Sequence, residues 1–137
     1  MRIKLFYEIS NFFIKKKSFF IKEIYTLLNN EGRYIGNINY IFCNDDYLLD
    51  MNKKYLKKNF YTDVLAFNYS INKCISGDIF ISIDRVYDNS KQWNQFFINE
   101  LKRVMIHAIL HFLGYDDHNH IDKEIMKRKE EFYLKLK

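Results

Sequence analysis

Short runs of β-branched and aromatic residues recur along the chain and predict the strands of a sheet. In the run NINYIFC, hydrophobic and polar side chains alternate, as they do in a strand that buries one face. The runs are residues 1–7, 37–43, 63–69 and 77–83. We therefore expect a sheet of about four strands.

Other stretches place apolar residues three and four positions apart, which is typical of helices that pack against a core. They are residues 18–30, 44–55, 90–113 and about 121–135. Ser18 is a candidate N-cap for the first helix, and Asn44 is one for the second. The third stretch is the longest, and Gly114 ends it because glycine readily adopts the left-handed conformation that follows a helix.

Strands and helices in this mixed order predict an α+β fold: a single domain over residues 1–137, with a mixed sheet packed against helices. The chain has 137 residues, enough to bury a core as one domain. Its composition, 48% hydrophobic and 28% charged, is that of a soluble globular protein and not of a disordered one.

Charge, cysteine content and the absence of long apolar runs indicate which partners and which cellular compartment to expect. The net charge of +5 is compatible with an anionic partner such as RNA, although it does not require one. Cys43 and Cys74 form no CxxC pair, so two reduced thiols in a cytoplasmic protein are expected. The start of the chain lacks the apolar segment of a signal peptide. No apolar run reaches the roughly 18 residues of a membrane span, so no membrane association is expected.

Two histidines stand out in the longest helical stretch, where the chain reads HAILHFLGYDDH over residues 107–118. On a helical wheel, His111 lies at the edge of an apolar stripe and His107 lies beside it, one turn back. The stripe consists of Phe97, Leu101, Val104, Met105, Ala108 and Phe112. A histidine pair with this spacing can grip one metal ion, although such pairs also occur by chance in helices without one.

The residues after the helix supply further ligand types. Asp116, Asp117 and His118 follow Gly114 closely. Two helix histidines plus one group from this loop would leave a fourth coordination position open for water, the pattern of a catalytic zinc rather than a structural one. The HExxH zinc-protease class is disfavoured, because Ala108 stands where that motif carries its glutamate base.

Three blocks together resemble the YbeY-type endoribonucleases, a family of rRNA maturation factors. The first block is HAILHFLGYDD, at residues 107–117. The second is MNKKYLKKNFYTDVLAF, at residues 51–67, and the third is SGDIFIS, at residues 76–82. The three blocks occur in the family's order and cover the chain from about Met51 to His118.

The resemblance implies an α+β domain with one Zn²⁺ ion at the end of a long helix. It implies a metal-dependent endonuclease that acts on single-stranded RNA, with rRNA and the small ribosomal subunit as partners and no DNA. The implied role is maturation of the 3′ end of small-subunit rRNA and ribosome quality control.

One departure from the family pattern concerns the third metal ligand. Asp117 occupies the position where the family usually has histidine, and His118 lies one residue later. Aspartate is a good zinc ligand. The favoured set is therefore His107, His111 and Asp117, with His118 as the alternative third ligand.

A second departure concerns catalysis. Leu56 replaces the family's arginine, and leucine cannot pair with a phosphate. Besides His107, the candidate catalytic residues are therefore Lys57 and Lys58, which would act as point charges. The alternative function is a non-catalytic, ribosome-associated maturation factor whose metal is structural.

Several neighbouring residues have ordinary explanations. The lysines of MNKKYLKKNF are candidates for steering RNA or for a solvated helix face. Their aromatic neighbours Tyr55, Phe60 and Tyr61 are expected to pack as core or scaffold more readily than to stack on bases. Glu100 is expected to pair with Arg103 at i,i+3.

Overall fold

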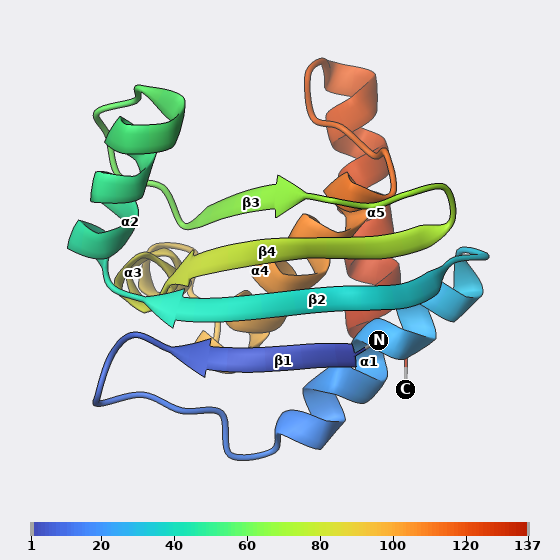
Figure 1. The fold of residues 1–137 in the computed structure, drawn as a ribbon, viewed down its shortest axis with the longest axis horizontal. Coiled ribbons are helices and arrows are strands. Elements are labelled where there is room, and N and C mark those ends of the chain that lie inside the picture. Colours follow the sequence, from blue (N-terminus) through green and yellow to red (C-terminus); the bar gives the residue numbers. More distant parts are fainter. Residues whose placement is uncertain (1, 137) are drawn as a thin grey trace.

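Four strands form one mixed sheet in the computed structural model, which describes residues 2–136 (Figure 1). The strands are β1 (Arg2–Tyr7), β2 (Tyr34–Cys43), β3 (Val64–Asn68) and β4 (Cys74–Ser82). Their order is β1-β2-β4-β3; the first three are mutually parallel, and β3 pairs antiparallel with β4. The expected α+β class and mixed four-stranded sheet are confirmed, and β3 forms one edge.

Helices cover one face of this sheet, seen behind it in Figure 1. They are α1 (Lys17–Asn30), α3 (Ile83–Gln92), α4 (Phe97–Phe112) and α5 (His120–Lys135). A separate lobe at the end of the sheet is formed by α2 (Asp45–Met51) and the π-helical turn η1 (Asn52–Leu56). Within residues 2–136, no helix is both long and apolar enough to cross a membrane.

The expected single helix over residues 90–113 is wrong, because the chain turns between α3 and α4. Trp93 caps α3, and Asn94 follows it with a φ of 52°. The Asn94 amide donates to Lys91 at 3.2 Å and the Gln95 amide to Ser90 at 2.8 Å, which is a Schellman motif. Asparagine tolerates the left-handed conformation, so it ends α3 here without glycine.

Two smaller expectations at helix starts have different outcomes. Ser18 does not cap α1, which begins at Lys17 with Lys16 in the cap position and no side-chain cap bond. Asn44 does cap α2, since its side chain accepts a hydrogen bond from the Tyr47 amide at 2.9 Å. The segment up to Leu56 is helical as expected, but its last five residues form the π-helical turn η1.

The long helix α4 forms the centre of the core between the sheet and α5 (Figure 1). Leu101, Ile109 and Leu110 on this helix are completely buried. The hydroxyl of buried Tyr40, on β2, donates to the carbonyl of Met105 at 2.9 Å and so fixes α4 along the sheet. This packing holds the last two turns of α4 rigidly, and those turns carry the histidine pair.

Candidate metal centre

His107 and His111 lie one turn apart on α4, and their rings meet edge-on, with 4.5 Å between the ring centres. Their Nε2 atoms are 3.0 Å apart, and their side chains are 19% and 33% exposed. Both rings lie at the margin of the core, because the neighbouring positions of α4 are fully buried. The helix therefore presents two imidazole nitrogens to one point at the surface.

The chain after α4 returns a carboxylate to the same point. Gly114 has a φ of 104°, its amide donates to His111 at 3.0 Å, and the Tyr115 amide donates to Leu110 at 3.1 Å. This Schellman motif reverses the chain into residues 114–119, here called the ligand loop. Asp117 Oδ2 then lies 3.7 Å from His111 Nε2 and 3.9 Å from His107 Nε2.

These three donor atoms fit a zinc ion. All of them lie within 4.8 Å of one another. Tetrahedral zinc with ligands about 2.1 Å away separates its donors by about 3.4 Å, which falls among the three separations found here. Asp117 is 48% exposed, so the group is open toward solvent on one side.

His118, the alternative third ligand, lies outside this group. Its side chain is 79% exposed, and its Nε2 atom is 3.8 Å from Asp116 Oδ2. His120 is the first residue of α5 and is also exposed. The geometry therefore favours His107, His111 and Asp117 as the ligand set.

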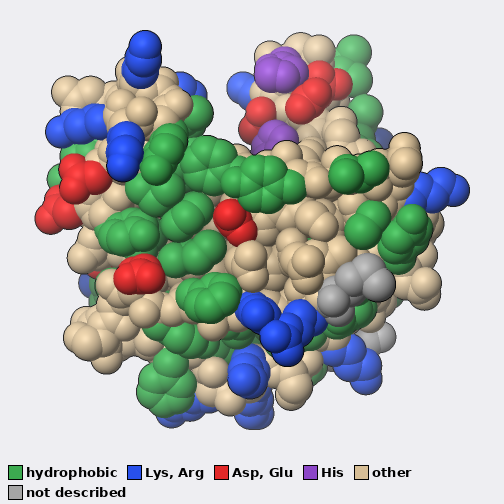
Figure 2. Space-filling view, in the orientation of Figure 1, with side chains coloured by type: hydrophobic (Ala, Val, Ile, Leu, Met, Phe, Trp, Pro, Cys, Tyr) green, Lys and Arg blue, Asp and Glu red, His purple; other side chains and the backbone are tan. Residues whose placement is uncertain are grey.

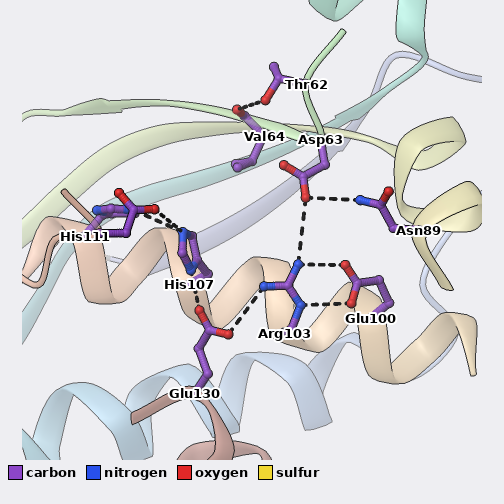
Figure 3. Close-up of polar contacts among 10 residues, drawn as sticks. Thr62, Asp63, Val64, Asn89, Glu100, Arg103, His107, His111 and Glu130 are labelled. Carbon is purple, nitrogen blue, oxygen red and sulfur yellow. Dashed lines mark hydrogen bonds and ion pairs between the residues drawn. The ribbon is translucent and has the colours of Figure 1, made fainter. Parts of the chain in front are cut away.

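Glu130, on α5, contacts the other side of His107 (Figure 3). Its Oε2 atom is hydrogen-bonded to His107 Nδ1, and its Oε1 atom accepts from Arg103 Nη1 at 3.3 Å. A carboxylate accepts, so Nδ1 carries the proton and Nε2 keeps the lone pair that a metal needs. Sequence reasoning missed Glu130, although it lies on the apolar stripe of α5 between the buried Met126 and Tyr133.

Arg103 extends this contact toward the sheet. It donates to both carboxylate oxygens of Glu100, at 2.8 and 2.7 Å, so the expected i,i+3 pair is confirmed. Asp63, just before β3, lies 3.8 Å from Arg103 and accepts from Asn89 at 3.5 Å. Hydrogen bonding to Glu100 raises the pKa of Arg103, which keeps the guanidinium charged among these carboxylates.

Burial and the neighbouring His107 lower the pKa of His111 below its usual value. Desolvation disfavours the charged imidazolium, and a second imidazole close by disfavours it further. The neutral form is the one that binds a metal ion. At neutral pH, His111 is therefore ready to act as a ligand.

The lobe formed by α2 and η1 carries the other candidate residues. Lys57, which has a φ of 54°, and Lys58 are exposed at its end, and Lys58 Nζ lies 5.9 Å from the centre of the Phe60 ring. Leu56 is 43% exposed on the same lobe. Figure 2 shows Lys and Arg side chains on this lobe, His and acidic side chains on the protrusion across from it, and a hollow between them above β3. Lysines and histidines are thus on opposite sides of the hollow.

The aromatic residues of this region are not core residues. Tyr55, Phe60 and Tyr61 are each at least half exposed. Tyr55 packs edge-on against Phe67, with 5.8 Å between ring centres, and the guanidinium of Arg85 lies 5.6 Å from the centre of the Tyr61 ring. These side chains are accessible to a ligand, although Lys54, Lys58 and Arg85 each lie over one of the three rings.

Comparison with known proteins supports the resemblance found in the sequence. The sequence model of the family described as Endoribonuclease YbeY matches residues 8–136. A protein named Endoribonuclease YbeY from Karelsulcia muelleri is 46% identical over 132 residues, which cover 96% of this chain and 93% of the relative. Its namesake from Flavobacterium psychrophilum is 45% identical over 130 residues, or 95% and 92% of the two chains.

A solved structure shows the same fold. The solution structure of a Thermotoga maritima protein superimposes with a TM-score of 0.70 at 25% identity. The match covers 96% of this chain and 86% of that protein. The arrangement of sheet and helices described above therefore exists in a protein studied in solution.

Proposed function

This chain belongs to the YbeY endoribonuclease family, and from that premise we propose that it is a zinc-dependent endonuclease that cleaves single-stranded RNA. We place its action in the cytoplasm, on the small ribosomal subunit, in maturation of the rRNA 3′ end and in ribosome quality control. The observation that carries the proposal is the convergence of His107, His111 and Asp117 on one open point.

The three proposed ligands come from two parts of the fold. The histidines come from one rigid helix, and Asp117 comes from the loop and contributes a negative charge. A zinc ion held there supplies Lewis-acid chemistry toward a phosphodiester. Glu130 holds the His107 ring in one orientation and keeps its proton on Nδ1.

The hollow above β3 is the route we propose for RNA (Figure 2). Lys53, Lys54, Lys57 and Lys58 are exposed on one side and attract the phosphate backbone. The exposed faces of Tyr55 and Tyr61 offer stacking surfaces for unpaired bases. Lys57 and Lys58 are the candidates to contact the phosphate that reacts, in place of the arginine that Leu56 replaces.

Leu56 also supports a second candidate function. Its aliphatic side chain is 43% exposed on the lysine-bearing lobe and cannot donate to a phosphate. A maturation factor that binds the ribosome and keeps zinc only as a structural element would tolerate this residue. Cleavage activity separates the two functions.

The test is cleavage of an end-labelled single-stranded RNA carrying the rRNA 3′-end sequence, with zinc present. We expect the wild type to cleave, and His107→Ala and Asp117→Ala to lose both cleavage and bound zinc. His118→Ala is the matched control and should retain both. Loss of zinc in His118→Ala but not in Asp117→Ala would show that His118 is the third ligand.

The remaining outcomes concern activity. Equal cleavage by the wild type and His107→Ala would reveal a contaminating nuclease and leave the proposal without support. Zinc binding by the wild type without cleavage would favour the non-catalytic factor. In that case Leu56→Arg should be assayed, since restored cleavage would identify Leu56 as the cause.

A further inference from the structure

Glu31, at the end of α1, receives hydrogen bonds from three donors that belong to later parts of the chain. Tyr115 Oη donates to Glu31 Oε1 at 2.6 Å. Lys129 Nζ donates to Glu31 Oε2 at 3.0 Å, and the hydroxyl of Tyr133 donates to the same oxygen. The Glu31 side chain is only 10% exposed. One carboxylate thus joins α1, the ligand loop and α5.

The contact with Tyr115 is distinctive because of where it lies. Tyr115 is two residues before Asp117, in the ligand loop. Its hydrogen bond reaches from the ligand loop across the fold to the end of α1. The Asn119 side chain, by contrast, accepts from the nearby Asp122 amide at 2.8 Å and caps α5. The ring of Tyr115 is also covered by Lys129 Nζ, 5.3 Å from its centre.

The position of the loop decides whether three ligands meet. His107 and His111 are fixed by the buried helix α4, whereas Asp117 is half exposed and approaches them only through the loop. A displacement of the loop by about 1 Å would take Asp117 out of range, since metal–ligand distances vary by only about 0.2 Å. The site is therefore most sensitive to whatever anchors this loop.

We propose that Glu31, acting through Tyr115, is a positioning residue for the metal centre: it holds the ligand loop where Asp117 meets the two histidines. This inference rests on the proposed function, because it assumes that the three residues bind a metal. Glu31 itself touches neither the ligands nor the substrate. Its role is to hold the ligand loop beyond the turn at Gly114, which fixes only the start of the loop.

The experiment compares two variants, each of which removes one tyrosine hydroxyl that donates a hydrogen bond to the Glu31 carboxylate. Tyr115→Phe cuts the tether of the loop, and Tyr133→Phe, the matched control, cuts a bond to α5 but leaves the loop tethered. Zinc affinity is measured by competition with a chromophoric chelator. We expect Tyr115→Phe and Glu31→Gln to weaken binding about tenfold, the lower end for groups that orient metal ligands, and Tyr133→Phe to change it little.

Two further readouts separate positioning from general stability. In metal-free protein, amide hydrogen exchange in residues 115–119 should be faster in Tyr115→Phe and Glu31→Gln, with exchange in α4 unchanged. In the cleavage assay, the zinc concentration for half-maximal activity should rise, whereas the maximal rate at saturating zinc should stay at the wild-type level. Tyr115→Phe and Glu31→Gln disrupt the same hydrogen bond. The double variant should therefore bind zinc about as weakly as either single variant.

The inference would be overturned by unchanged zinc affinity in Tyr115→Phe and Glu31→Gln, or by equal weakening in Tyr133→Phe. Failure of the proposed function gives a different result. A wild type that binds no zinc overturns that function and this inference together, whereas zinc bound equally by the wild type and all three variants overturns this inference alone.

Discussion

At the scale of single residues, the contact between Glu130 and His107 shows how a carboxylate can orient an imidazole that is a candidate metal ligand. Glu130 is 9% exposed, and Arg103 contacts its second oxygen, so its negative charge is compensated. The carboxylate accepts from Nδ1 and holds the ring, which leaves Nε2 directed toward His111. The orientation of His107 thus depends on a residue of another helix.

This contact predicts the effect of Glu130→Gln. The amide keeps the shape of the side chain but orients the imidazole less strongly and leaves Arg103 less well compensated. We expect zinc affinity to fall by about 10-fold or more, as for other residues that orient a metal ligand. Glu131→Gln is the control, because Glu131 is the exposed neighbour on α5. Equal affinities in competition titrations of the two variants would contradict this role.

Glu31 predicts a dependence of stability on pH. Burial raises the pKa of its carboxyl, but hydrogen bonds from Tyr115, Tyr133 and Lys129 lower it by more, so the net pKa is below its usual 4.5. A lowered folded-state pKa means that the stabilisation is complete above the unfolded-state pKa and is lost as pH falls through the folded-state value. The contribution is therefore full at neutral pH and absent in strong acid.

Urea unfolding of metal-free wild type and Glu31→Gln would measure this contribution. We expect the variant to be less stable at neutral pH, and the difference to shrink as the pH falls from about 5 toward about 3. Metal-free protein is needed because acid also releases zinc from its ligands. A difference in unfolding free energy that stays constant over this range would show that the charge of Glu31 contributes nothing.

At the scale of elements, the turn between α3 and α4 determines where α4, the helix that carries His107 and His111, begins. Asn94 occupies the left-handed position of a Schellman motif, and Arg103 of α4 lies over the Trp93 ring at 5.5 Å. The turn therefore contacts the helix that it introduces. A residue at position 94 that disfavours a positive φ would disfavour this turn, and with it the separation of α3 from α4.

Substitutions of Asn94 test this turn. Asn94→Val should destabilise the fold by about 1–2 kcal/mol, the cost of a left-handed conformation for a residue with a branched Cβ. Asn94→Gly is the matched variant and should be as stable as the wild type or slightly more so, because glycine adopts this φ without strain. Urea denaturation measures both. Equal destabilisation by valine and glycine would mean that the asparagine side chain, and not the backbone, is what matters.

At the scale of the whole molecule, a basic lobe and the candidate metal centre lie near opposite ends of the edge strand β3 (Figure 1), with the hollow of Figure 2 between them. The net charge of +5 by itself does not identify an RNA-binding face. What distinguishes these lysines is that they belong to the lobe across the hollow from the candidate metal centre. Only lysines that contact phosphate contribute counterion release.

Lysine substitutions therefore test the path of the RNA. Replacing Lys53, Lys54, Lys57 and Lys58 by alanine should weaken binding of single-stranded RNA. The slope of log affinity against log salt should fall by about 0.7 for each lysine that contacts a phosphate. The control replaces Lys15, Lys16 and Lys17, which are exposed at the start of α1, away from the hollow. Filter-binding titrations at several salt concentrations that give equal slopes for both sets would contradict the proposed path.

Much of this protein could be predicted from the sequence, because the relevant signals are local. Strand and helix periodicity, the cap at Asn44 and the glycine after α4 act within a few residues, so they are readable without the fold. The spacing of His107 and His111 places both on one helix face by geometry alone. The family resemblance came from three such local blocks.

The tertiary structure decided what depends on distant contacts. Glu130 meets His107 across 23 residues of sequence, and Glu31 meets Tyr115 across 84. No periodicity relates such pairs, because their proximity follows from the packing of α1, α4 and α5. The break at Asn94 was missed for a related reason: the polar helix α3 buries only Val86 and Ser90. Its weak apolar pattern left residues 84–89 unassigned, and its last three residues were joined to α4. The position of Asp117 relative to His118 likewise depends on the path of the ligand loop, which the turn at Gly114 and the tether to Glu31 set together.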